Sequence, residues 1–197
     1  LTAYLPPGEV SGLVSSSLGF QTPVFKTFNA GVSVVAGQVP IFVEGAEGSE
    51  RRLILTGGLR PSPSLRAEGQ LTYARITRAS DDGEYSRTVL PRLKLEYQPT
   101  RALFFRVISE YRIEHVGALF GAISHAPLSN ADGTEVGTTK SSTLRSDWLV
   151  SFEPSPGTVA FIGYGSLLDR PESLELSHRL RRQSDGFFLK LAYQFRH

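Results

Sequence analysis

The sequence predicts an all-β protein: an antiparallel, up-and-down transmembrane β-barrel, of which this chain is a C-terminal fragment of about nine or ten strands. Two patterns favour this fold. Apolar and polar side chains alternate with a period of two, as on the two faces of a strand, and short and long connections alternate along the chain. The composition agrees, because 40% hydrophobic residues with 19 Gly and 12 Pro is too apolar for disorder and too interrupted for a helical bundle.

The alternation places the strands in order. We expect them near residues 10–20, 25–36, 51–59, 65–77, 85–98, 102–115, 144–152, 158–168 and 187–196, with residues 1–5 as the end of an earlier strand. Residues 39–44 form either a short strand or part of a loop, because Pro40 cannot donate to a ladder. The longest apolar stretches are far below the roughly 18 to 20 residues that a membrane-spanning helix needs.

The connections predict an orientation. Short links that contain proline occupy residues 60–63, 98–101 and 153–157, whereas longer polar links occupy residues 78–84, 116–141 and 169–185. Bacterial outer-membrane barrels have short periplasmic turns and long external loops. The chain is therefore expected in a bacterial outer membrane, with its C-terminus in the periplasm.

One face of each strand is nearly free of charge, and we expect this face to contact lipid. A Lys or Arg on the lipid side at mid-bilayer costs roughly 2 to 4 kcal/mol, so the charged face should line a lumen. The candidate lumenal charge ladder comprises Arg92, Lys94, Glu96, Arg106, Glu110, Arg112, Glu114, Arg145, Asp147 and Lys190.

The last strand carries a candidate assembly signal. Its apolar face consists of Phe187, Leu189, Leu191, Tyr193 and Phe195. The expected partners are therefore outer-membrane lipid and the barrel-assembly machinery. Trp148, the sole Trp, falls on the expected outer face, where a place in an aromatic belt or against a neighbouring strand is expected.

Charge and composition exclude several functions. A net charge of +2 argues against a nucleic-acid partner. The absence of Cys excludes disulfides, Cys-ligated zinc and thiol catalysis. The absence of Met, with a start at Leu1 and no signal segment, predicts that the sequence is an internal or C-terminal piece.

No catalytic, cofactor or metal residues are predicted. The four His residues lack metal-pair spacing, and the Gly163-Tyr164-Gly165-Ser166 segment lacks the rest of a nucleophile or phosphate motif. Glu110 and Glu114 should be about 13 Å apart, beyond the roughly 5 to 9.5 Å of a glycosidase pair.

Two loop segments are further candidate sites. The segment 130–135 resembles a calcium loop in part, but a polar turn explains it better. Arg179, Arg181 and Arg182, expected just before the last strand, fit either lipopolysaccharide phosphates or an ordinary solvated loop.

Several segments resemble the C-terminal region of the domain of unknown function 5916 family. The resemblance rests on residues 144–159, on Gly163-Tyr164-Gly165-Ser166 and on residues 180–191, and extends more loosely through residues 91–97 and Tyr111-Arg112. It implies a barrel-like region that follows an upstream carbohydrate-binding domain of the family-9 type, which this sequence does not contain. A glycan partner is thus implied only through that domain, and no catalytic residue is carried over.

Two alternative folds and functions are also compatible with the sequence. The first is a soluble β-sandwich that serves as a carbohydrate-binding or lectin-like module, with the apolar faces as its core. The second is part of a glycan-processing hydrolase whose active site lies elsewhere or in the lumen.

Overall fold

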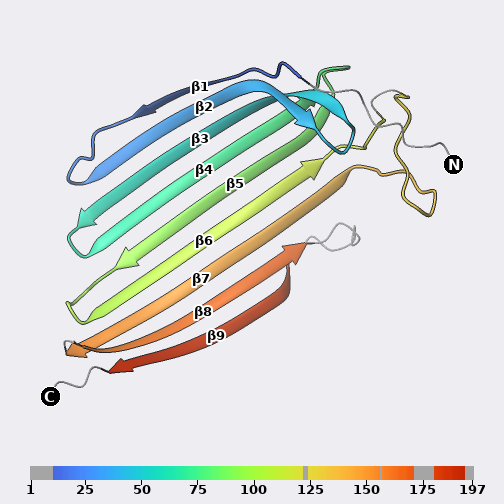
Figure 1. Cartoon of the computed structure of the whole chain (residues 1–197). Coiled ribbons are helices and arrows are strands. Elements are labelled where there is room, and N and C mark those ends of the chain that lie inside the picture. Colours follow the sequence, from blue (N-terminus) through green and yellow to red (C-terminus); the bar gives the residue numbers. More distant parts are fainter. Residues whose placement is uncertain (1–10, 122–123, 156, 171–179, 194–197) are drawn as a thin grey trace.

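The computed structural model describes residues 11–121, 124–155, 157–170 and 180–193, and this part of the chain is all-β, without a helix. It forms one antiparallel sheet whose nine strands follow each other in chain order (Figure 1). The strands are β1 (Ser15–Gln21), β2 (Phe28–Ile41), β3 (Ala46–Ser62), β4 (Leu65–Arg78), β5 (Glu84–Tyr97), β6 (Leu103–Val116), β7 (Thr139–Ser155), β8 (Thr158–Arg170) and β9 (Arg181–Tyr193). The all-β, antiparallel, up-and-down prediction is confirmed.

The connections differ between the two ends of the sheet. At one end the links comprise residues 22–27, 63–64, 98–102 and 156–157, and at the other end residues 42–45, 79–83, 117–138 and 171–180. The longest links therefore share one end, and β9 runs toward the short-turn end (Figure 1). The expected alternation of short and long links does not hold in the first half of the chain, since the link at residues 22–27 is longer than that at residues 42–45, and residues 79–83 and 98–102 form links of equal length.

Several strands are longer than the alternation predicts. The strand expected from residue 187 begins at Arg181, so the expected loop at residues 169–185 was too long, and β3 extends beyond residues 51–59 at both ends. Arg181 and Arg182 pair with Asp169 and Leu168, beyond a register shift between Leu167 and Leu168. Strand pairing thus continues into the polar start of β9, where apolar and polar side chains no longer alternate. The expected strand end at residues 1–5 lies outside the described residues.

The prolines lie inside strands rather than only in turns. Pro40 continues β2 opposite Glu47, which settles residues 39–41 as strand, whereas residues 42–45 form the turn. Pro61 and Pro154 lie in β3 and β7 at register shifts, between Leu59 and Ser62 and between Phe152 and Ser155. A bulge leaves backbone donors unpaired, so proline is tolerated there.

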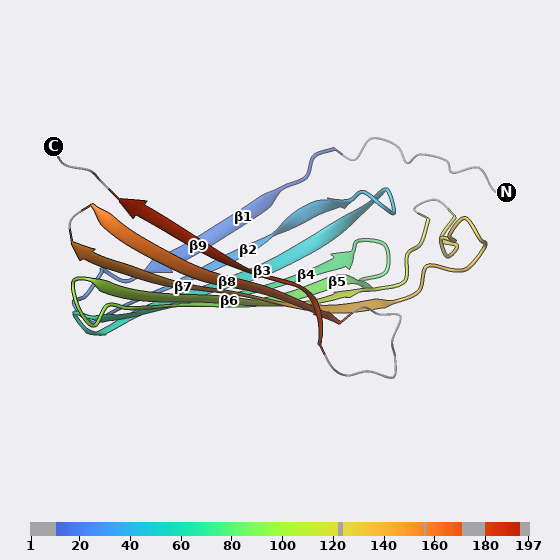
Figure 2. The same cartoon turned by 90° about the horizontal axis from the view of Figure 1, so that it is seen from below.

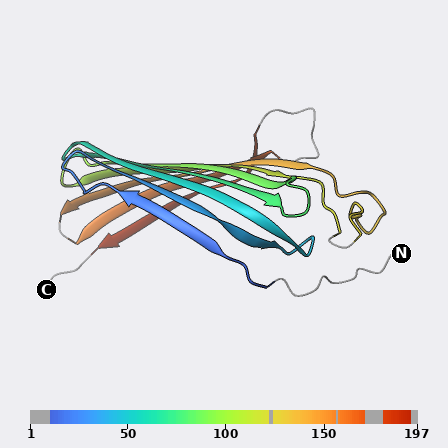
Figure 3. The same cartoon turned by 90° about the horizontal axis from the view of Figure 1, so that it is seen from above.

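The sheet is a single curved layer. Figures 2 and 3 show a trough in which β1 and β9 bend toward the same side. Ile41 is the one buried hydrophobic side chain among the described residues, at 2% exposure. No second layer of described residues covers either face. Among these residues, no helix is long and apolar enough to cross a membrane.

One face of the sheet is apolar across all nine strands. The register aligns Phe20 with Val32, Val32 with Leu55 and Leu55 with Leu71. The same face continues to the other edge through Leu95, Val107, Trp148, Tyr164 and Phe187. Its large side chains are exposed, for example Trp148 at 53% and Leu189 at 66%.

Candidate functional site: the charged concave face

The ten residues of the expected charge ladder lie on the face opposite the apolar one. Nine of them come from β5, β6 and β7, which are adjacent in the sheet. Arg92 pairs in register with Glu110, and Glu110 with Arg145. Lys190 lies on the same face but on β9, opposite Phe161 of β8. The register therefore brings the β5–β7 residues together and leaves Lys190 at the sheet edge.

Alternating charges on this face form short ion pairs. Lys94 Nζ lies 2.8 Å from Glu96 Oε1 and 3.5 Å from Glu68 Oε2. The Arg112 guanidinium lies 2.9 Å from Glu114. Opposite charges on neighbouring strands and at every second position of one strand stabilise each other in this way.

The neighbouring row on this face is paired in the same manner. Arg145 Nε lies 3.1 Å from Asp147 Oδ2, and Arg92 Nη1 lies 3.9 Å from Glu110 Oε2. Glu110 and Glu114 thus each have a basic neighbour. This geometry favours a charge network over glycosidase chemistry.

The network extends further than the sequence reasoning indicated. Arg66 and Glu68 of β4 form an ion pair, and Glu68 links this pair to Lys94. Arg52 of β3 pairs with Glu50 at 2.5 Å. The even positions Arg66, Glu68, Gln70 and Thr72 carry the signal that predicts this face of β4.

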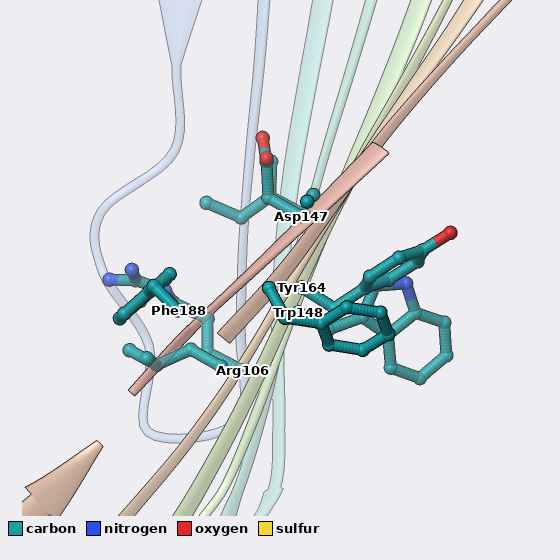
Figure 4. Close-up of a pocket in the computed structure, with 10 residues that line it drawn as sticks. Arg106, Asp147, Trp148, Tyr164 and Phe188 are labelled. Carbon is teal, nitrogen blue, oxygen red and sulfur yellow. The ribbon is translucent and has the colours of Figure 1, made fainter. Parts of the chain in front are cut away.

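Two hollows open over the charged face. The smaller one, of about 210 Å³, is lined by Arg92, Ile108, Glu110, Arg145 and Asp147. The larger one, of about 460 Å³, lies between β6 and β9. Figure 4 shows Arg106, Asp147 and Phe188 on one side of the strands and Trp148 and Tyr164 on the other. The blue N-terminal strand also lies on the Arg106 side, so the charged face is the concave one.

Small residues shape the floor of the larger hollow. The Gly163-Tyr164-Gly165-Ser166 segment lies within β8, as expected. Phe188 of β9 lies directly over Gly163, where a Cβ would come within 1.9 Å of the phenyl ring. Gly165 pairs in register with Gly186, so no side chain fills this part of the wall. The segment therefore serves packing of a strand pair, not a phosphate or nucleophile loop.

A buried ion pair at the long-loop end was missed by the sequence reasoning. Arg78 donates to Glu44 through Nε at 2.8 Å and Nη2 at 2.6 Å, with side-chain exposures of 8% and 2%. Glu44 also accepts from the Phe120 backbone N–H at 3.0 Å, and Arg78 donates to the Ala118 carbonyl at 2.6 Å. The links at residues 42–45 and 117–138 and the end of β4 are thus joined at one point. The partners are 34 and 76 residues apart, so no local pattern reveals them.

The other predicted sites are placed as follows. Phe187, Leu189, Leu191 and Tyr193 share the apolar face of β9, whereas Phe195 lies outside the described residues. Arg179 also lies outside them, and Arg181 and Arg182 lie in β9 rather than before it.

The segment 130–135 forms a small polar turn. The Asp132 carboxylate accepts from the Thr134 hydroxyl at 2.6 Å and from its backbone N–H at 2.9 Å. These hydrogen bonds lower the pKa of Asp132, the side-chain bond most. Within the described ranges, no cluster of three or more His, Asp or Glu side chains could hold a metal ion.

The chain matches no family model, no curated protein and no solved structure. The resemblance to the domain of unknown function 5916 family thus remains a prediction.

Proposed function

We propose that the chain forms the wall of a bacterial outer-membrane β-barrel, whose charged concave face lines a wet interior. The observation that carries this proposal is the exposed apolar face, which is continuous over nine strands. Soluble monomers rarely expose apolar patches larger than a few hundred Å². In a membrane, lipid chains would cover this face and shield its apolar side chains from water.

The strand dimensions support a membrane role. From Val89 to Tyr97, β5 keeps the apolar face free of charge over nine residues, close to the roughly nine to eleven that a tilted strand needs to cross. The ion pairs of the charge ladder lie on the opposite face, where water can solvate them. On the apolar face, the pairs of Glu84 with Arg75, Arg87 and His115 lie at the long-loop end, beyond the apolar span. The asymmetry of the links fits short periplasmic turns and long external loops.

Closure is part of the proposal. In the described sheet, β1 and β9 each pair on one side only. An open edge in lipid leaves backbone donors and acceptors unsatisfied, so we propose further strand pairing at both edges. The barrel would act as a pore, a plugged channel or an anchor for an upstream carbohydrate-binding domain, with the barrel-assembly machinery as its insertion partner.

The cysteine-free sequence allows a direct test on one strand. Single cysteines replace Leu71 and Tyr73 on the apolar face of β4, and Gln70 and Thr72 on the concave face. In membranes, a maleimide that cannot cross lipid should label positions 70 and 72 and spare positions 71 and 73. Equal labelling of all four positions, in protein that is folded by circular dichroism, would contradict the proposal and favour a soluble sheet.

A further inference from the structure

A row of basic side chains crosses the apolar face near its long-loop end. The register aligns Arg51 of β3 with Arg75 of β4, Arg75 with Arg87 of β5, Arg87 with His115 of β6, and His115 with Lys140 of β7. Each lies two residues beyond the last apolar or small position of its strand, such as Leu53, Tyr73 or Val89. We call these five residues the basic row. With strands about 4.8 Å apart, the row spans roughly 19 Å.

The basic row is not neutralised as the concave face is. Within the described residues, Glu84 is the one carboxylate in contact with it, at 2.9 Å from Arg75, 3.6 Å from Arg87 and 3.2 Å from His115. Arg51 and Lys140 are exposed and make no ion pair with another described residue. Four permanent cations thus face one anion, whereas Arg52, the concave-side neighbour of Arg51, is paired with Glu50.

The position of the row matches a lipid head-group region. The apolar span between the basic row and the short-turn end has the length of a membrane crossing, as β5 shows from Val89 to Tyr97. At the short-turn end the same face carries Leu59, Tyr97, Phe105 and Phe152 instead of basic residues. The two boundaries of the apolar band therefore differ in charge.

We propose that the basic row binds the phosphate groups of anionic lipids at the long-loop side of the membrane. This inference rests on the proposed membrane function. Arg presents a fork of N–H donors that matches phosphate oxygens, and Lys supplies a point charge. Positive side chains near an anionic membrane surface each favour association by about 1 kcal/mol, or roughly fivefold. The row therefore selects anionic head groups over zwitterionic ones.

The test uses the whole chain reconstituted in phosphatidylcholine vesicles. Electron paramagnetic resonance of spin-labelled lipids separates lipid in contact with protein from bulk lipid. Labelled phosphatidylglycerol should be preferred over labelled phosphatidylcholine, and this preference should weaken as salt rises. The double variant Arg51→Gln with Lys140→Gln should bring the two lipids close to parity. Arg52→Gln, which removes the adjacent charge on the concave face, should leave the preference unchanged.

The outcomes separate the two proposals. The basic row is overturned as a lipid site if the contact lipid shows no preference for phosphatidylglycerol. It is also overturned if that preference persists at high salt and in the double variant. In both cases the membrane proposal still stands. If no contact-lipid population forms, the membrane proposal fails and the lipid site fails with it. Salt dependence is measured on the unaltered chain, so this test does not depend on how the variants fold.

Discussion

Lys94 holds together the concave-face charge network, because it lies between two carboxylates. Its ammonium group contacts Glu68 on β4 and Glu96 on β5. Replacement by Gln leaves these carboxylates without their shared cation. All three side chains are partly exposed, at 28%, 36% and 21%, so solvent screens the interaction. The substitution should lower the free energy of unfolding by about 1 kcal/mol at low salt.

The Lys94→Gln prediction is checked by urea unfolding in lipid vesicles at low and high salt. The destabilisation should shrink at high salt, because screening weakens the repulsion that remains. Lys190→Gln serves as a control, since Lys190 makes no ion pair with another described residue. Equal effects of the two substitutions would show that Lys94 has no special role.

Asp132 offers a test of the polar turn in the longest link. The Thr134 hydroxyl and backbone N–H hold the pKa of Asp132 below its ordinary value. A lowered pKa means that these hydrogen bonds stabilise the turn above the ordinary Asp pKa and are lost as pH falls through the lowered one. Thr134→Val should raise the pKa of Asp132, measured by nuclear magnetic resonance pH titration. An unchanged pKa would mean that the hydroxyl does not donate in solution.

At the scale of elements, the β8–β9 pair depends on Gly163. A methyl group at this position would collide with the Phe188 ring, which would have to move aside. Gly163→Ala should therefore lower the free energy of unfolding by about 1 kcal/mol, the low end of the usual cost of overpacking, because the half-exposed ring can move. The control is Gly186→Ala on the partner strand, since a Cβ there meets nothing within 4 Å.

A second substitution should restore stability to the Gly163→Ala variant. Combining Gly163→Ala with Phe188→Leu removes the ring and should restore part of the unfolding free energy. Without any recovery, the cost would have to come from the backbone of β8 and not from the ring contact.

The buried Arg78–Glu44 ion pair, which we call the tether, is a second feature at this scale because it joins two links to the end of β4. Glu44→Gln removes the charge that binds Arg78 and weakens the acceptor for the Phe120 N–H. Removal of one partner of a buried ion pair lowers the free energy of unfolding by roughly 3 to 5 kcal/mol. Hydrogen exchange at Phe120 should accelerate strongly, whereas Glu47→Gln on the adjacent strand should not change it. If Phe120 exchanges equally in both variants, the tether does not hold this link.

Much of the strand order could be predicted because alternation is local in sequence. Residues 102–115 predict β6 to within one residue, since its apolar and charged positions alternate cleanly. The start of β9 was missed because Arg181, Arg182 and Gln183 are all polar, although Arg181 and Arg182 still pair with β8. The Arg78–Glu44 contact and the basic row depend on which strands become neighbours, and that information is not in any short segment.

At the scale of the whole molecule, the curved sheet separates two environments. The concave face carries opposite charges in contact, and the convex face carries exposed apolar side chains bounded by the basic row. A sheet with one apolar and one polar face normally packs the apolar face against another layer. Here lipid is proposed as that layer.

The most direct test of this account compares two adjacent positions on β7. Trp148 is the sole Trp and lies on the apolar face, whereas Leu149 lies on the concave face. The unaltered chain and the variant Trp148→Phe with Leu149→Trp are reconstituted in vesicles that contain brominated phospholipids. We predict strong quenching by brominated lipid for Trp at 148, and quenching by aqueous iodide instead for Trp at 149. Weak lipid quenching at 148, or equal quenching at both positions in folded protein, would contradict the account.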